Sequence, residues 1–182
     1  MARKDLKRRT HEMLARYDRA LLRRAAAFLY LKETHSSFEV EREKPSPDRA
    51  RRFADLLREG ERGAPLSESR LSELQNAVVD ARFHEFSYRR QQNWIGQDLG
   101  HRKKVDFVPA RPEDVLALMN GVVGFSETLR ANPGSMDPVV AAASLAFGFI
   151  FIHPFMDGNG RLHRYLVHEV LSSSGFTPKG IV

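Results

Sequence analysis

DPVVAAASLAFGFIFIHPFMDGNGRLHRYLVHEVL, residues 137–171, predicts two packed helices joined by a glycine-rich turn. Asp137 and Pro138 are typical of a helix start, and residues 139–152 are apolar at almost every position. A helix that is apolar on nearly all sides is buried, so we expect this segment at the centre of the fold. From Arg161 onward the apolar spacing again predicts a helix. The turn between them is therefore held by a rigid support.

The turn and the second helix start together have the composition of an anion site. Glycine lets consecutive backbone N–H groups point at one anion, and the first turn of a helix has unpaired N–H groups. Arg161 and Arg164 lie three apart in that first turn, where the helix dipole disfavours cations. Guanidinium groups bind phosphate oxygens with paired donors. These residues favour a polyphosphate ligand.

Two further side chains of the turn have types suited to catalysis. Asp157 fits a magnesium ligand, because Mg²⁺ prefers few carboxylates together with phosphate oxygens. His153, four residues earlier, is a candidate general base. The alternative is an ordinary surface turn, since Asp-Gly and Asn-Gly pairs often mark one.

The turn also carries a family resemblance. Eight positions resemble the complete signature of Fic-domain proteins: His153, Phe155, Asp157, Gly158, Asn159, Gly160, Arg161 and Arg164. The resemblance implies a mostly α fold, a Fic-type helical bundle around a buried central helix with one small β-hairpin flap. It also implies a protein adenylyltransferase, in which His153 deprotonates a target hydroxyl that attacks the α-phosphate of ATP and expels pyrophosphate.

The same resemblance assigns the other roles. Asp157 would hold Mg²⁺, and Phe155 would anchor the loop. The nucleotide phosphates would be bound by Gly158, Asn159, Gly160, Arg161 and Arg164. The partner would be a target protein with a Ser, Thr or Tyr hydroxyl, and this chain is itself one such candidate target.

Residues 36–42 contain a second match. By composition this segment is either a helix end or a short strand. Ser37 and Glu41, four apart, resemble the inhibitory motif of Fic proteins, which implies that Glu41 pairs with Arg164 and blocks placement of the γ-phosphate. A solvent-facing glutamate is the alternative. The family has Gly or Asn after this glutamate, whereas this chain has Arg42.

The remaining elements are expected from pattern. In residues 1–30, apolar side chains at spacings of three and four predict one long amphipathic helix packing on the core, followed by a Fic domain over 31–182. Ser46 and Ser67 are expected to cap two structural helices that end near residues 59 and 81. Residues 86–108 predict a β-hairpin. Its Trp94, Ile95 and Gly96 resemble the target-binding flap, although Trp94 is equally a core anchor.

Composition limits the functional classes. The chain of 182 residues, 42% apolar, is long enough for one domain with a core, and the absence of cysteine excludes disulfides and thiolate metal sites. The net charge of +6 raises the possibility of nucleic-acid binding. However, 23 acidic residues are interspersed with the 29 basic ones, which favours a solvated basic face. No secretory signal or membrane-length apolar run is present, which predicts a cytoplasmic protein without membrane contact. The oligomeric state stays open.

Two other functions remain as alternatives at this stage. One is a hydrolase that removes AMP from a modified protein, with Glu41 orienting water. The other is a nucleotide- or DNA-binding regulator without catalysis. Residues 172–182 have the composition of a helix end followed by the start of a further apolar element. Since Fic proteins continue with more helices, a natural C-terminal extension is expected.

Overall fold

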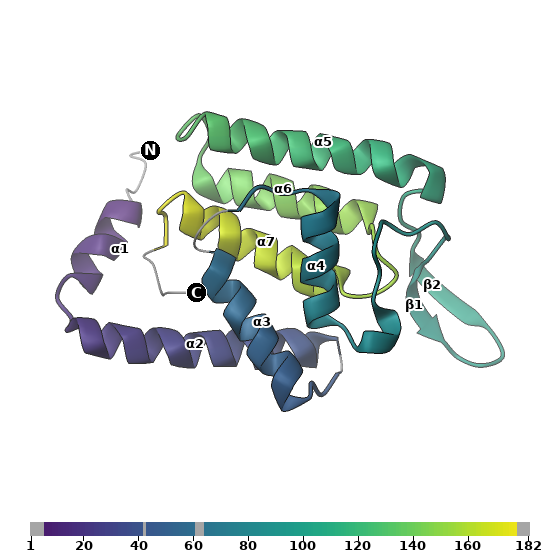
Figure 1. Cartoon of the computed structure of the whole chain (residues 1–182), viewed down its shortest axis with the longest axis horizontal. Helices are drawn as coiled ribbons and strands as arrows, with labels where there is room; N and C mark the ends of the chain where they lie inside the picture. Colours follow the sequence, from purple (N-terminus) through teal and green to yellow (C-terminus); the bar gives the residue numbers. More distant parts are fainter. Residues whose placement is uncertain (1–5, 42, 61–63, 178–182) are drawn as a thin grey trace.

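The computed structural model describes residues 6–41, 43–60 and 64–177, and it shows a helical bundle with one two-stranded sheet (Figure 1). This confirms the predicted mostly α fold with a small hairpin. The elements in chain order are α1 (Leu6–Leu14), α2 (Arg19–Val40), α3 (Pro47–Gly60), α4 (Glu68–Val78), the 3₁₀ helix η1 (Ala81–Phe83), β1 (Ile95–Asp98), β2 (Lys103–Phe107), α5 (Pro112–Ala131), α6 (Pro138–Ile152) and α7 (Asn159–Ser173).

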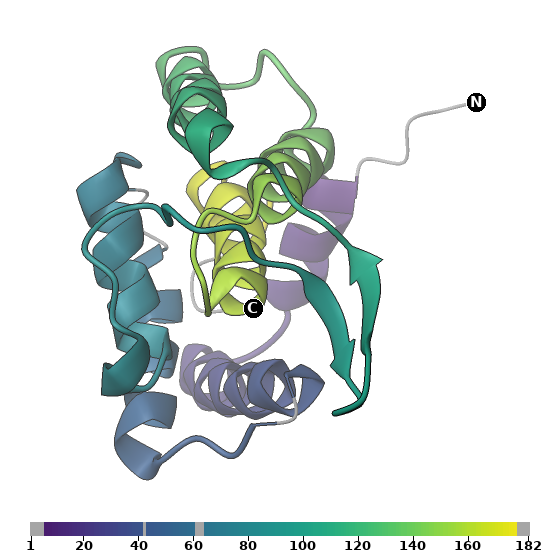
Figure 2. The same cartoon turned by 90° about the vertical axis from the view of Figure 1, so that its right-hand side faces the viewer.

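The helices α6 and α7 form the centre of the bundle. They pack on each other, α5 packs on α6, and α3 and α4 pack on α7. Figure 2 shows these layers around α7, with α5 above it and α2 below. Phe149 and Leu166 are completely buried, and burial of such side chains stabilises the fold by about 1.5–3 kcal/mol each. The bundle therefore fixes both ends of the loop between α6 and α7.

The two sides of α6 differ in solvent exposure, although its nearly all-apolar composition predicted burial on both sides. Asp137 caps the helix by accepting hydrogen bonds from the N–H groups of Val139 and Val140 at 3.0 and 3.4 Å. Leu145 is buried on the inner side, but Phe147 and Phe151 are exposed on the outer side. The neighbours α5 and α7 cover only part of α6, so its apolar composition does not require burial on all sides.

The N-terminal prediction of one helix over residues 1–30 is wrong. The chain leaves α1 at Leu14 and begins α2 at Arg19, because the Asp18 carboxylate caps a new helix by accepting from the N–H groups of Ala20 and Leu21 at 2.8 and 3.1 Å. The apolar face does not pack on the core either, since Met13, Tyr17, Leu21 and Phe28 are exposed. Periodicity identified an amphipathic surface but not the cap that interrupts it.

The C-terminal part of α2 does reach the core. Phe38 is completely buried, with its ring 6.0 Å from that of Phe53 on α3. Since α2 continues to Val40, the segment of the second motif is a helix end and not a strand. The bundle thus brings Ser37 and Glu41 to α7.

The two predicted serine caps are confirmed. Ser46 accepts from the N–H of Arg49 at 3.3 Å at the start of α3, and Ser67 accepts from the N–H of Arg70 at 3.1 Å at the start of α4. The helix α4 ends at Val78, before the expected residue 81, and the short η1 follows. Both helices lie against α7 and make up one wall of the site.

The hairpin is shorter than residues 86–108. Antiparallel β1 and β2 pair Asp98 with Lys103, with an irregularity next to Gly96. A β-carbon on Gly96 would overlap the Lys104 carbonyl oxygen, so this position requires glycine. Trp94 lies just before β1, half-buried, with the Lys103 ammonium 5.3 Å from its ring centroid.

Two sequence expectations concern residues outside the described ones: Arg42 after the second motif, and residues 178–182 of the expected C-terminal apolar element. Within the described parts of the chain, no helix combines the length and the apolar character needed to cross a bilayer.

Candidate active site

The loop between α6 and α7 has two residues in the left-handed conformation. His153 ends α6 with φ 58° and ψ 63°, and Gly158 begins α7 with φ 88°. Glycine adopts such angles freely, but for another residue they cost about 1–2 kcal/mol. His153 is therefore held in place by its surroundings.

Arg89 supplies much of that restraint. It is buried, and its guanidinium donates to the carbonyl oxygens of His153 at 2.7 Å, Gln91 at 2.9 Å and Ala110 at 2.5 Å. Its own N–H donates to the Pro154 carbonyl at 2.8 Å. Sequence reasoning missed Arg89, because one arginine in an irregular polar segment has no spacing signal.

The His153 ring is set up as a neutral base. Its Nδ1 lies 3.3 Å from the Ile150 carbonyl oxygen. A carbonyl only accepts, so the ring proton is assigned to Nδ1 and the lone pair to Nε2. Burial lowers the pKa of His153, and the Arg89 charge acts in the same direction. The imidazole is thus neutral near pH 7 and can accept a proton at Nε2.

Asn159 is a brace inside the loop. Its side-chain oxygen accepts from the Phe155 N–H at 3.0 Å, and its Nδ2 donates to the Phe155 carbonyl at 2.7 Å. Asn93 donates to the same carbonyl at 3.0 Å. Phe155 is completely buried against the ring of Tyr88, as expected for the loop anchor. The Asn159 side chain, which the resemblance placed near the nucleotide phosphates, is therefore engaged within the loop.

Two more residues that sequence reasoning missed support the loop backbone. Gln75 on α4 donates from Nε2 to the carbonyls of Phe83 and Asp157 at 2.9 and 3.3 Å. Glu85 accepts from the Met156 N–H at 2.8 Å, and burial raises the pKa of Glu85. Both act over long sequence separations, which a local pattern cannot show.

The N-terminal end of α7 has no side-chain cap from its N-cap residue, Gly158. The first N–H groups of α7, which start at Asn159 and Gly160, therefore have no partner of that kind. A β-carbon on Gly158 would collide with Val79, so this loop fits closely against α4.

Arg164 is bound by the end of α2. Its Nε donates to Ser37 Oγ at 2.7 Å, and its Nη2 donates to the Ser37 carbonyl and to Glu41 Oε1, both at 2.9 Å. The Glu41 carboxylate also lies against Gly160, where any β-carbon would overlap it. Glu41 thus occupies the anion-attracting end of α7 and is not simply solvent-facing.

Arg161 turns into the protein. It is 2% exposed, and its Nη1 donates to Glu43 Oε2 at 2.5 Å and to the Val78 carbonyl at 2.9 Å. Its Nη2 donates to Asp157 Oδ1 at 2.9 Å. The arginine expected to face phosphate is therefore engaged by protein groups.

Asp157 fits a magnesium ligand that is completed by other oxygens. Its Oδ1 accepts from the Gly158 N–H at 2.6 Å as well as from Arg161, and no hydrogen bond among the described residues uses Oδ2. The described residues contain no group of three or more potential metal-ligating side chains. One carboxylate with phosphate and water oxygens is a coordination that Mg²⁺ uses.

The hairpin is attached close to this loop. The ring of Phe107 on β2 lies 5.3 Å from that of Phe151, which is stacked in turn on Phe147, and Phe151 precedes His153 by two residues. Ile95 and Gly96 lie in β1 and are exposed, so this strand has backbone groups available to a partner.

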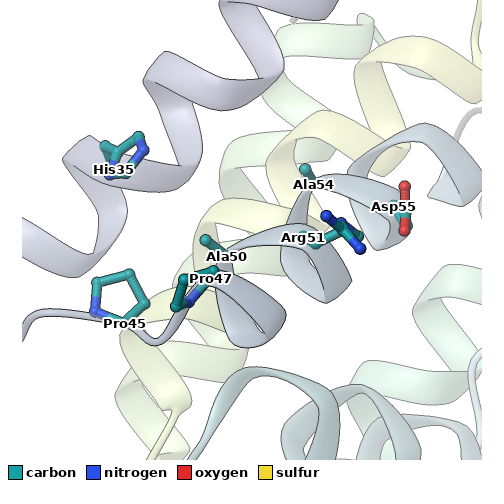
Figure 3. Close-up of a pocket in the computed structure, with 7 residues that line it drawn as sticks. All are labelled: His35, Pro45, Pro47, Ala50, Arg51, Ala54 and Asp55. Atoms are coloured by element: carbon teal, nitrogen blue, oxygen red, sulfur yellow. The ribbon is translucent and has the colours of Figure 1, made fainter.

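A hollow of about 530 Å³ lies elsewhere, between α2 and α3 (Figure 3). Its lining residues are His35, Pro45, Pro47, Ala50, Arg51, Ala54 and Asp55. None belongs to the loop or to either motif, and we assign it no chemistry.

Comparison with known families decides the classification. A family model described as Fic/DOC family matches residues 65–171, more than half of the chain. The chain belongs to the Fic/DOC family. The matched range contains α6, the signature loop and all but the last two residues of α7.

Relatives named Protein adenylyltransferase Fic are similar to part of this chain. The protein from Nematostella vectensis is 39% identical over 74 residues, 40% of this chain and 17% of that protein. The one from Drosophila ananassae is 37% identical over 92 residues, 50% of this chain and 16% of that protein. This Fic chain thus matches about a sixth of the length of these relatives.

A solved structure shows the fold over nearly the whole chain. It is a Fic domain containing signaling protein from Bacteroides thetaiotaomicron, with a TM-score of 0.73 and 24% identity, covering 93% of this chain and 73% of that one. The arrangement of helices described above is therefore one found in Fic proteins.

Proposed function

We propose that this Fic protein is an adenylyltransferase that moves AMP from Mg-ATP to a hydroxyl group of a target protein. The observation that carries the proposal is a neutral histidine with a free Nε2, held next to an uncapped helix N-terminus that attracts anions. The names of the relatives support the same activity.

The proposed reaction assigns one proton transfer to His153. Nε2 takes the proton of the target hydroxyl as its oxygen forms a bond to the α-phosphorus of ATP. The bond from that phosphorus to the bridging oxygen breaks, and pyrophosphate leaves with the electron pair. The lowered pKa of His153 keeps the ring unprotonated before the reaction.

Phosphate binding is assigned to the start of α7. The N–H groups of Asn159 and Gly160 would donate to phosphate oxygens, with Arg164 at the γ-phosphate and Arg161 beside Asp157, whereas the Gly158 N–H donates to Asp157 Oδ1. Mg²⁺ bound at Asp157 Oδ2 would offset the phosphate charge. The positive charges of Arg161 and Arg164 both lie near the N-terminal end of α7, so a polyphosphate fits this site better than a neutral ligand.

Glu41 would restrain this activity. Its carboxylate and Ser37 take the Arg164 donors at 2.7–2.9 Å, the same donors that a γ-phosphate needs. An anion cannot use them until Glu41 leaves. Glu41→Gly should therefore raise AMP transfer.

The target segment would bind along β1, next to Trp94, Ile95 and Gly96. Main-chain hydrogen bonds to an exposed strand supply affinity with little sequence demand. The acceptor is a Ser, Thr or Tyr hydroxyl, including one of this chain, and the expected location is the cytoplasm.

Intact mass spectrometry after incubation with Mg-ATP tests the proposal without a known target, because the chain can modify itself. We expect an AMP-sized gain in Glu41→Gly and none in Glu41→Gly/His153→Ala. His84→Ala in the same background is the matched control, since His84 is exposed and its backbone N–H donates to Ala81, outside the loop. AMP transfer that persists without His153 would refute the mechanism, and a phosphate-sized gain would refute the assignment of the attacked phosphorus.

A further inference from the structure

We propose that Glu43 is a positioning residue for the metal site: it holds and neutralises Arg161, which in turn orients the Asp157 carboxylate and leaves Oδ2 for the metal ion. The inference rests on the proposed use of Mg-ATP. It concerns a residue outside both sequence motifs.

Glu43 joins two arginines from different helices. Its Oε2 accepts from Arg161 on α7 at 2.5 Å, and both of its oxygens lie 3.1 Å from Nη2 of Arg49 on α3. Both arginines also donate to the Val78 carbonyl, at 2.9 and 3.1 Å. One carboxylate and one carbonyl at the end of α4 therefore fix the positions of two guanidinium groups.

Burial makes this carboxylate necessary. Arg161 and Arg49 are both buried, and their guanidinium carbons lie 5.1 and 5.2 Å from the centroid of the same Phe38 ring. A buried cation needs a paired anion, since desolvation otherwise costs several kcal/mol. Glu43 supplies the charge for both of them together with Asp157.

The contact continues from Arg161 to Asp157. Arg161 Nη2 and the Gly158 N–H both donate to Oδ1, at 2.9 and 2.6 Å. Two donors on one oxygen fix the rotation of the carboxylate, which directs metal binding to Oδ2. Partners that orient a metal ligand commonly change metal affinity by about 10- to 100-fold when they are removed.

The charges of the cluster predict whether each substitution raises or lowers the affinity for the metal ion. In this cluster two arginines face two carboxylates. Loss of Glu43 leaves one excess positive charge beside the metal site and repels a divalent cation, whereas loss of Arg49 leaves one excess negative charge and attracts it. Two substitutions in the same buried cluster thus have opposite expected effects on metal affinity.

The test measures Mn²⁺ binding in the presence of ATP by electron paramagnetic resonance, with Glu41→Gly as the parent chain. Glu43→Gln should weaken Mn²⁺ binding by about 10- to 100-fold. The matched control is Arg49→Gln, which perturbs the same cluster without touching Asp157 and should bind Mn²⁺ as tightly as the parent or more tightly. Parent-like Mn²⁺ affinity in Glu43→Gln, or equal weakening in both variants, would overturn the proposal.

A second comparison covers the case in which Glu43→Gln does not fold. Arg49→Gln/Glu43→Gln removes the cation that would lack a partner. It should bind Mn²⁺ at least about tenfold more weakly than Arg49→Gln alone, and equal affinity would overturn the proposal. The Mn²⁺ measurement does not require AMP transfer. If Mn²⁺ binding depends on Glu43 but the chain transfers no AMP, the proposed function is refuted and the role of Glu43 stands.

Discussion

Two arginine–glutamate pairs connect the residues just after α2 to the first two turns of α7, and their arginines differ in burial. In the pair of Arg161 and Glu43 the side chains are 2% and 33% exposed. In the pair of Arg164 and Glu41 they are 22% and 36% exposed. The glutamates are two residues apart in the sequence and the arginines three, but only the pair of Glu41 and Arg164 was expected from sequence motifs.

The difference shows how environment assigns distinct roles to one kind of contact. An exposed ion pair contributes about 0–1 kcal/mol, so an incoming phosphate can displace Glu41 from Arg164. Breaking a buried pair costs about 3–5 kcal/mol. The outer pair is therefore suited to regulation, and the inner pair is suited to holding the site in shape.

The largest expected effect is on the free energy of unfolding, which should fall more when the inner pair is broken than when the outer pair is broken. Arg161→Met should lower the free energy of unfolding by about 3–5 kcal/mol, because Glu43 and Asp157 lose a buried partner. Arg164→Met, the matched change on the same helix, loses a partly exposed ion pair and the hydrogen bonds to Ser37, and should cost less, about 1–3 kcal/mol. Urea unfolding followed by circular dichroism measures both. Equal losses would mean that burial does not distinguish the pairs.

The pH dependence of AMP transfer tests whether Glu41 also affects the base. His153 must be unprotonated, and burial lowers its pKa below the usual 6.5. The rate should therefore fall about tenfold per pH unit only below an inflection under pH 6.5. The Glu41 charge raises the pKa of His153, so Glu41→Gly should move the inflection to lower pH than in the wild-type chain. An inflection above 6.5 would contradict His153 as the base.

Ser37→Ala tests the outer pair more gently. It removes the 2.7 Å hydrogen bond from Arg164 Nε but keeps the bond to the Ser37 carbonyl. A bond of about 1 kcal/mol predicts activation of AMP transfer of roughly fivefold, smaller than in Glu41→Gly. Ser36→Ala is the control, because Ser36 is exposed. Equal rates in the two alanine variants would remove Ser37 from the restraint.

Gly160→Ala has the smallest expected effect and a sign that depends on Glu41. Alanine favours a helix by up to about 1 kcal/mol over glycine, but its β-carbon would overlap the Glu41 carboxylate. The substitution should stabilise Glu41→Gly and should be neutral or destabilising in the wild-type chain. Thermal unfolding of the four combinations measures this coupling. The same change in both backgrounds would mean that Glu41 does not lie against Gly160.

Motifs and local patterns predicted much of the site. The apolar run of α6, the glycine turn and the start of α7 are contiguous, and the pairing of Glu41 with Arg164 followed from the resemblance of two short motifs. The predicted phosphate role of Arg161 did not anticipate its burial against Glu43 and Val78. Local spacing does not show which side of a helix turn is covered.

Sequence by itself determined the mostly α bundle, the hairpin, the family signature and the candidate base, since each depends on neighbouring residues and on periodicities of two or 3.6. Tertiary structure alone decided the restraint of His153 by Arg89 and the different burial of Arg161 and Arg164. These features depend on partners that are distant in the chain, or on desolvation by packed helices. The type of a residue limits which hydrogen bonds and ion pairs it can form. The fold determines which of these form in the interior, where water is excluded.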